Sequence, residues 1–299
     1  MARRLILIGA VATALMGLLL WGAARVSRRA SELQDEEMGL LDHLREMRFR
    51  ALASLAAVTV ATVALFSFDV RYGTLAGYTT WYPVPSVTDS LASRLLSYIL
   101  QTSLPEGVGI VVLNPSEAIV AQLQAAVLGG LVLAAPVVAY QVAAFVAPAL
   151  KTEERRFVAL LAPLAGGLFL AGIAFGFWIM VPVTLRTLYA YAGTFGAEAL
   201  ARPQETLGFI LLTSGLFGVA FELPLIMAGL SYAGLVHPDT MGRHWRGVVV
   251  AILIIGAVLS DPSPLTQVLI AGPVVVLYLA GLGAARMTWR MGGHARPRS

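Results

Sequence analysis

Seven long apolar runs constrain the fold of this 299-residue chain more than any other feature of its sequence. They span residues 5–24, 51–68, 118–145, 158–189, 207–230, 247–259 and 265–285. Most of them reach the ~20 residues that a helix needs to cross the ~30 Å hydrocarbon core of a bilayer. Because lipid offers the backbone no hydrogen-bond partner, runs of this length predict membrane-spanning helices rather than barrel strands. The expected fold class is an all-α polytopic membrane protein.

Composition supports this fold class and excludes several kinds of function. Hydrophobic residues make up 58% of the chain and charged residues 13%, whereas a soluble domain averages ~45–50% and ~25%. The absence of cysteine excludes disulfides, thiolate metal sites and cysteine nucleophiles. No phosphate-binding loop, serine elbow or HExxH motif is present, and the four histidines lack metal-ligand spacing. The sequence therefore predicts neither an enzyme nor a metal or cofactor site.

Basic residues gather in alternate loops and so orient the chain. One set comprises Arg45, Arg48, Arg50, Lys151, Arg155, Arg156, Arg243, Arg246, Arg286, Arg290, Arg296 and Arg298, whereas the alternate loops hold only Arg71, Arg94, Arg186 and Arg202. Since basic residues favour the cytoplasmic side, the segment 45–50 and the C-terminus are expected in the cytoplasm. From residue 51 onward this gives six spans with both ends inside. Arginines confined to short loops do not indicate nucleic-acid binding.

Three local features shape the expected bundle. Prolines lie within or near the ends of the predicted spans and predict kinks, hence a curved bundle with a concave face: Pro136, Pro163, Pro182, Pro224 and Pro273. In the long outer segment 69–117, Trp81 and Tyr82 fit a cap at the membrane interface. The run 247–259 gives only ~20 Å of helix. Followed by the turn 260–264, it is expected to thin the bilayer locally.

The first apolar run, residues 5–24, leaves three interpretations open. It is a cleaved signal sequence, a seventh span with an external N-terminus, or a segment ahead of a true start at Met38. Cleavage and export would carry residues 25–50 outside, against the charge rule, so a seventh span is favoured. We therefore divide the chain into an extra N-terminal hydrophobic helix (1–30), a membrane domain (31–290) and a cytoplasmic tail (291–299).

Charged residues at two places carry information about function. Residues 31–50 have leucine and methionine at helical spacing and predict an amphipathic helix on the inner membrane surface, with Glu46 and Arg48 on its polar face. Glu153 and Glu154 fit the first turn of the next helix, where acids complement the dipole. A solvated surface and a helix start explain these acids without any further role.

Glu222 is different, because no other charged residue lies between Glu205 and Asp239. A charged carboxylate in the middle of a lipid-facing helix costs ~3 kcal/mol or more. The side chain must therefore be protonated, face a wet cavity, or pair with a group inside the membrane. A structural hydrogen bond within the bundle is the alternative to a functional role.

Four motifs in register resemble the TatC family. Residues 43–50 (HLREMRFR) resemble the signature H-L-x-E-L-R-x-R, and residues 114–118 (NPSEA) resemble its S-P-x-E/F element. Residues 140–156 (YQVAAFVAPALKTEERR) and 217–224 (FGVAFELP) resemble Y-Q-x-x-x-F-x-x-P-x-L-x-x-x-E-R-R and F-G-x-x-F-E-x-P. The resemblance covers roughly residues 38–286. Residues 5–24 lie outside the usual six-span pattern, and residues 261–267 (DPSPLTQ) depart from the family's turn, so no role passes to Asp261.

The resemblance implies a curved six-helix TatC-like bundle, with the run 5–24 as an extra N-terminal helix. It also implies a twin-arginine signal-peptide receptor, the core subunit of an oligomeric translocase. This translocase moves folded proteins across a bacterial or archaeal cytoplasmic membrane by the proton-motive force. Single-span TatA and TatB subunits are the implied partners. Matching the motifs assigns signal-peptide binding to Glu46, Arg48, Glu154 and Arg155, partner docking to Glu222, Phe221 and Pro224, and a structural role to Phe145 and Pro148.

Two other classes stay open from the residues alone. A proton-coupled secondary transporter could also use one buried glutamate and proline-broken helices, although it would usually show internal repeats. A purely structural membrane scaffold would leave Glu222 unexplained, and an intramembrane protease is more remote. Binding of a twin-arginine peptide, compared with a twin-lysine control, distinguishes a receptor from these classes.

Overall fold

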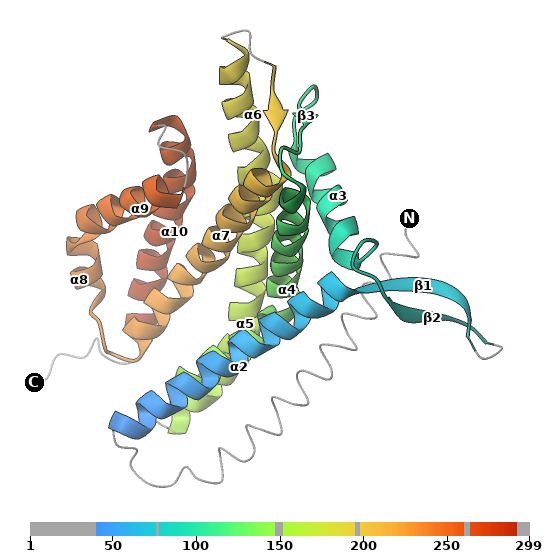
Figure 1. Ribbon diagram of the computed structural model, residues 1–299. Helices are drawn as coiled ribbons and strands as arrows, with labels where there is room; N and C mark the ends of the chain where they lie inside the picture. Colours follow the sequence, from blue (N-terminus) through green and yellow to red (C-terminus); the bar gives the residue numbers. More distant parts are fainter. Residues whose placement is uncertain (1–39, 76–77, 147–151, 195–197, 260–263, 292–299) are drawn as a thin grey trace, which may run out of the picture. The chain divides into compact units, whose positions relative to one another are not determined.

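The structure is a computed structural model that describes residues 40–75, 78–146, 152–194, 198–259 and 264–291 (Figure 1). Its helices are α2 (Leu40–Ser67), α3 (Leu91–Ser103), α4 (Pro115–Val146), α5 (Thr152–Phe175), the π-helical turn η2 (Gly176–Met180), α6 (Val181–Gly193), α7 (Pro203–Tyr232), α8 (Pro238–Arg243), α9 (Trp245–Leu259) and α10 (Pro264–Met291). Short strands form two pairs: β1 (Phe68–Leu75) with β2 (Tyr78–Pro85), and β3 (Gly109–Ile110) with β4 (Leu200–Ala201).

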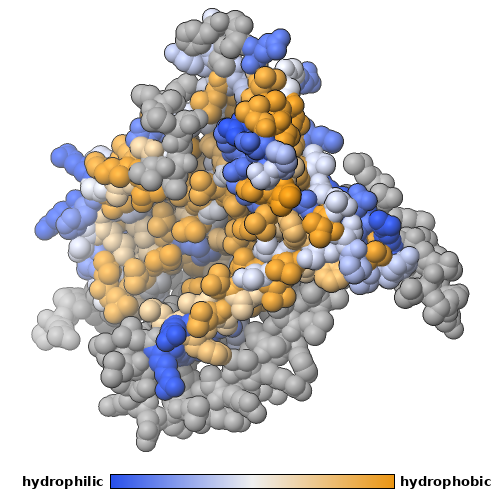
Figure 2. Space-filling model, in the orientation of Figure 1, coloured by the Kyte–Doolittle hydropathy of each residue, from blue (hydrophilic) through white to orange (hydrophobic). Residues whose placement is uncertain are grey.

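Membrane-spanning helices account for most of the described chain, which confirms the all-α polytopic class. Five of the described helices are long and apolar enough to cross a bilayer, and α9 is a shorter apolar helix. Apolar residues cover most of the visible surface of the described residues (Figure 2), as lipid-facing helices require. The count of six spans plus an extra helix stays a prediction, since residues 5–24 lie outside the described residues.

The described residues form two compact units, whose boundaries pass through α3, α4 and α5. The first unit takes in Met1–Leu95 and Ala126–Gly167, and the second Leu96–Ala125 and Leu168–Ser299. Within the first unit, α2 packs on α4 through small residues: Ala57 and Ala134 are buried together with Val137.

The continuous helix α2 corrects one expectation. Residues 31–50 were predicted to form a separate helix on the membrane surface, but from Leu40 the chain runs unbroken to Ser67. No proline or glycine interrupts it, and the Ser54 hydroxyl donates to the Arg50 carbonyl at 3.0 Å, within the helix. The helical pattern was right, and the break after Arg50 was wrong because nothing in the sequence ends the helix there.

An ion-paired hairpin follows α2 in the first unit. Strands β1 and β2 are antiparallel, with Phe68 opposite Pro85. The fully buried Asp69 carboxylate accepts from the Val70 amide at 2.8 Å and from Arg94 Nη2, in α3, at 2.7 Å. These bonds fix the hairpin to α3. The sequence predicted an interfacial cap here but not its strands.

In the second unit, α7 is clamped between α5 and α10. A Cβ on Gly172 would lie 2.8 Å from Gly218 Cα, and one on Gly176 would lie 2.8 Å from Ser214 Cα. Only glycine lets α5 and η2 approach α7 this closely. On its other side, α7 packs on α10 around Met227 and Tyr278 (Figure 1).

A π-helical turn separates α5 from α6, just ahead of Pro182. The Val181 amide donates to the Gly176 carbonyl, five residues back. Proline cannot donate to the carbonyl four residues before it, so the ladder is already interrupted at this point. The wider turn accommodates the extra residue.

The short apolar helix expected near residues 247–259 is confirmed as α9, which has 15 residues. At ~1.5 Å rise per residue it is ~22 Å long, below the ~30 Å hydrocarbon thickness. Gln267 Nε2 of α10 donates to the Leu253 carbonyl at 2.9 Å and so fastens the pair. Residues 260–263 of the predicted turn lie outside the described residues.

Candidate functional site

The Glu46 carboxylate lies in the first part of α2, and only one of its two oxygens has a hydrogen-bond partner among the described residues. Its Oε1 accepts from Arg50 Nη2 at 2.5 Å and from Arg50 Nε at 2.9 Å. Its Oε2 is buried and has no hydrogen-bond partner among the described residues. A carboxylate can accept about four hydrogen bonds, so Glu46 keeps acceptor capacity for a second donor.

Arg50, and not Arg48, is the ion-pair partner of Glu46. The signal-peptide role that the resemblance assigns to Arg48 stays a prediction. Residues four apart on a helix share one face, whereas residues two apart do not face each other. Arg48 is exposed, so it is free to meet solvent or a lipid head group.

The remaining residues of the predicted signal site are only partly described. Glu154 and Arg155 lie in the first turns of α5, and Phe145 lies in the last turn of α4. Their side chains fall outside the described part of the chain, as does Pro148 entirely. The helix start at Thr152 agrees with acids placed to complement the dipole. Convergence of Glu154 with Glu46 stays a prediction.

Glu222 lies deep within α7 and is partly buried. The helix ends ten positions further on, at Tyr232, which corresponds to ~15 Å of rise. Its carboxyl interacts with the backbone of Phe169 in α5. One turn earlier, a Cβ on Gly218 would lie 2.9 Å from the Phe169 ring, so the close crossing brings Phe169 beside this acid.

Phe221 and Pro224, the predicted neighbours of Glu222 in docking, both pack within the second unit. The Phe221 ring lies 5.4 Å from that of Phe175, centroid to centroid. Gly281 of α10 packs closely against Pro224: a Cβ added to Gly281 would lie 3.0 Å from the Pro224 Cα. These contacts fix α7 on both sides of the acid. Among the described residues no three His, Asp or Glu side chains gather closely enough to hold a metal ion.

A buried ion pair that sequence reasoning missed joins the starts of α4 and α7. The Glu117 side chain is 2% exposed and accepts from Arg202 Nη2 at 2.6 Å. Asn114 Nδ2 also donates to it, at 3.2 Å, and the other Arg202 Nη donates to Glu205. The hydrogen bond that Arg202 donates to the Glu117 carboxylate raises the pKa of Arg202 above its already high ordinary value. The available signal was an acid two positions after Pro115, just ahead of an apolar run.

Two short strands reinforce this ion pair. The Gly109 amide donates to the Ala199 carbonyl, and the Val111 amide donates to the Ala201 carbonyl, each at 3.0 Å. The parallel pair β3–β4 therefore ties the loop before α4 to the loop before α7. We interpret Glu117 and Arg202 as structural residues that set the spacing of these two helices.

Replacing Arg202 by glutamine is expected to lower the thermal unfolding midpoint, because it leaves the Glu117 carboxylate buried without its main partner. Glu205→Gln, at a side chain that is 65% exposed, is the matched control and is expected to change the midpoint far less. Thermal unfolding in detergent, followed by circular dichroism, makes the comparison. Equal midpoints for both variants would contradict a structural role for the pair.

Comparison with known proteins gives one consistent result. The family model described as "Sec-independent protein translocase protein (TatC)" matches residues 42–273. A TatC protein of Cenarchaeum symbiosum is 32% identical, with 82% of this chain and 94% of that protein covered. A TatC protein of Synechocystis is 33% identical, with 85% and 90% covered. A chloroplastic TATC protein of Arabidopsis thaliana is 32% identical, with 88% and 71% covered.

A solved structure agrees with the sequence relatives. The crystal structure of a protein titled "Twin Arginine Translocase Receptor- TatC" superposes with a TM-score of 0.67 at 26% identity. The match covers 82% of this chain and 99% of that one. The fold and the sequence therefore point to the same family.

Proposed function

The chain belongs to the TatC family of Sec-independent protein translocase proteins, and on this basis we propose that it is the twin-arginine signal-peptide receptor of its translocase. In this role it is the core subunit that passes folded cargo across the membrane by the proton-motive force. Membership removes the main reason to consider a proton-coupled secondary transporter, because the relatives are named as translocase proteins over most of their length.

The observation that best supports a receptor is that one oxygen of the Glu46 carboxylate has no hydrogen-bond partner among the described residues. Oε1 is held by Arg50, while Oε2 is buried and lacks a partner among the described residues. A guanidinium group of the signal peptide can donate to such an oxygen, and charge-assisted bonds of this type are the strong ones. Glu154, at the start of α5, is the proposed second acid. Two acids suit two adjacent arginines, since guanidinium matches carboxylate geometry better than ammonium does.

Glu222 is the proposed docking group for a single-span TatA- or TatB-type partner. It lies too deep for so short a side chain to reach the membrane surface. Its neighbours Phe221 and Pro224 hold α7 against α5 and α10, so the acid is presented from a fixed helix. A protonated carboxyl can donate one hydrogen bond to a polar group on a partner helix.

We place the protein in a bacterial or archaeal cytoplasmic membrane, with the tail 291–299 on the cytoplasmic side. The positive charges of Arg243, Arg246, Arg286 and Arg290 support this orientation. Within the second unit, the Glu117–Arg202 pair then lies on the opposite side of the membrane. The short hydrophobic helix α9 leaves the bilayer thinner beside it.

Transport into inverted membrane vesicles tests the whole proposal. Vesicles that contain the chain with its partners are expected to import a folded protein bearing a twin-arginine signal, and a protonophore is expected to stop import. Import that persists without a proton gradient would contradict the proposed energy source. Import of the same cargo carrying a twin-lysine signal at an equal rate would contradict the receptor role.

Lengthening α9 by four leucines is expected to slow transport several-fold while leaving signal-peptide binding intact. The insertion adds ~6 Å of helix. It removes local thinning whose cost is a fraction of a kcal/mol per Å of mismatch, on the order of 1–2 kcal/mol in all. A control replaces the exposed Val250, Ile254 and Ile255 by leucine at unchanged length. Full transport by the lengthened variant would show that the short helix has no such function.

A further inference from the structure

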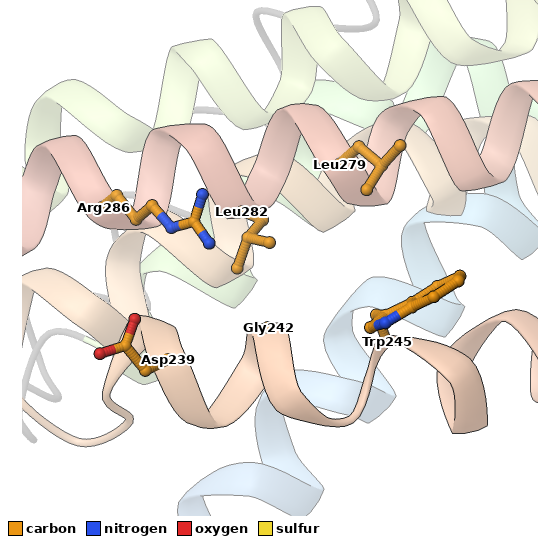
Figure 3. Close-up of a pocket in the computed structure, with 6 residues that line it drawn as sticks. All are labelled: Asp239, Gly242, Trp245, Leu279, Leu282 and Arg286. Carbon is orange, nitrogen blue, oxygen red and sulfur yellow. The ribbon is translucent and has the colours of Figure 1, made fainter.

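A groove of about 580 Å³ opens between α8 and α10 (Figure 3). None of the proposed signal-peptide or partner-docking residues lines it. The lining residues are Asp239, Gly242, Trp245, Leu279, Leu282 and Arg286. The groove therefore needs an explanation of its own.

The groove is polar at one end and apolar at the other. Asp239 and Arg286 lie at one end, Leu282 lies beside Gly242 in the middle, and Leu279 and Trp245 lie at the far end (Figure 3). Arg286 lies seven positions after Leu279 in α10, a rise of ~10 Å. The polar end is nearer the end of α10 at Met291, and the apolar end lies further into the span.

The floor and walls of the groove are fixed by local packing. Tyr278 of α10 donates its hydroxyl to the Met241 carbonyl of α8 at 2.7 Å. Gly242 provides the floor: a Cβ there would lie 3.6 Å from Arg286 Nη2 and 3.7 Å from a Leu282 methyl. A Cβ at this position would make ordinary van der Waals contacts with groove residues, so a larger side chain would extend into the groove.

The apolar end is open rather than packed. Leu279 is 52% exposed and Trp245 is 45% exposed. A tryptophan at the end of an apolar helix is typical of the membrane interface, where its ring contacts lipid. An acyl chain can therefore cover this end of the groove.

The charge around the polar end is strongly positive. Arg243, Arg246 and Arg290 lie close in sequence to the lining residues Gly242, Trp245 and Arg286. Arg286 forms no ion pair with an acid among the described residues. The one acid of the groove, Asp239, lies 3.5 Å from His237 Nδ1. An anionic group that reaches Arg286 is therefore attracted by several arginines and repelled by a single carboxylate.

We propose that this groove binds an anionic phospholipid, with its phosphate at Arg286 and one acyl chain along Leu282 toward Leu279 and Trp245. A guanidinium group matches phosphate oxygens in a bidentate way. The head group lies at the membrane surface and the chain points inward, which is the direction in which the groove becomes apolar. Asp239 can accept a hydrogen bond from the glycerol hydroxyls of phosphatidylglycerol, which phosphatidylcholine lacks.

Native mass spectrometry of the full chain in detergent tests this proposal with phosphatidylglycerol and phosphatidylcholine as probes. The wild-type chain is expected to retain phosphatidylglycerol about fivefold better than phosphatidylcholine, which is the effect that one arginine near a membrane surface predicts. Arg286→Gln is expected to abolish this preference and Arg286→Lys to retain most of it. Gly242→Leu is expected to lower retention of phosphatidylglycerol, because it fills the groove.

Two matched controls distinguish a specific lipid site in the groove from general electrostatic attraction of the lipid to nearby positive charges. Arg290→Gln removes the same charge one turn along α10, outside the groove, and Gly283→Leu adds the same bulk in open space. Gly283→Leu is expected to retain phosphatidylglycerol like the wild type, and Arg290→Gln is expected to keep most of the preference. The proposal is overturned if Arg290→Gln acts like Arg286→Gln, if Gly242→Leu acts like Gly283→Leu, or if the wild type shows no preference. Displacement of the lipid by inorganic phosphate would assign a free-anion site instead.

Discussion

Replacing Glu46 and Glu154 together by alanine is expected to weaken binding of a twin-arginine peptide by roughly tenfold or more, because charge-assisted hydrogen bonds contribute ~1.5–3 kcal/mol each. An exposed ion pair alone would contribute only ~0–1 kcal/mol. Burial of Glu46 Oε2 supplies the partial desolvation that raises this contribution. The fold is expected to persist, since both changes are helix-compatible alanines near helix ends.

The control for this double variant is Glu106→Ala, which removes an exposed acid from the loop between α3 and α4. It is expected to bind the peptide like the wild type. Fluorescence anisotropy of a labelled signal peptide, titrated with the purified chain, measures both affinities. Unchanged affinity in the double variant would remove Glu46 and Glu154 from the receptor site.

Replacing Glu222 by alanine is expected to weaken docking of a single-span partner by roughly three- to thirtyfold, since interhelical hydrogen bonds in membranes contribute ~0.6–2 kcal/mol. Glu222→Gln is expected to keep much of the docking, because an amide preserves the hydrogen-bonding shape. The alanine variant is expected to stay folded, since removing a polar group from lipid is usually tolerated.

Site-specific crosslinking from position 222 measures this docking directly. The matched control places the same crosslinker at Leu212, which lies on the same helix and is 50% exposed. A crosslink to a single-span partner from 222, and a weaker one from 212, is the expected pattern. A crosslink from 222 only to lipid or to the chain itself would instead assign Glu222 a structural role, through its interaction with Phe169.

The helices were predictable because lipid imposes a simple rule on long apolar runs. The short helix α9 was visible as a 13-residue run and is 15 residues long in the structure. The start of α2 was not predictable as a span, because the arginines at 45, 48 and 50 made residues 31–50 resemble a surface helix. A helix continues until a residue such as proline or glycine ends it, and the positions of charged residues do not show where that happens.

The candidate site residues were also predictable only where a local sequence pattern identifies them. Glu222 was identified because an isolated acid in an apolar run is costly, which a single sequence reveals. The ion pair of Glu46 with Arg50 follows from helical spacing, since residues four apart share one face, but the sequence analysis did not identify it. The Glu117–Arg202 pair spans 85 positions. Such a contact depends on how two distant loops meet, which local patterns cannot give.

The central claim is that this chain recognises paired arginines, and the most direct measurement compares two signal peptides that differ only there. The purified chain in detergent is titrated with a labelled twin-arginine peptide and with its twin-lysine counterpart. Because guanidinium groups match carboxylates bidentately and ammonium groups do not, we expect at least roughly tenfold tighter binding of the twin-arginine peptide. Equal affinity for the two peptides would contradict the receptor function.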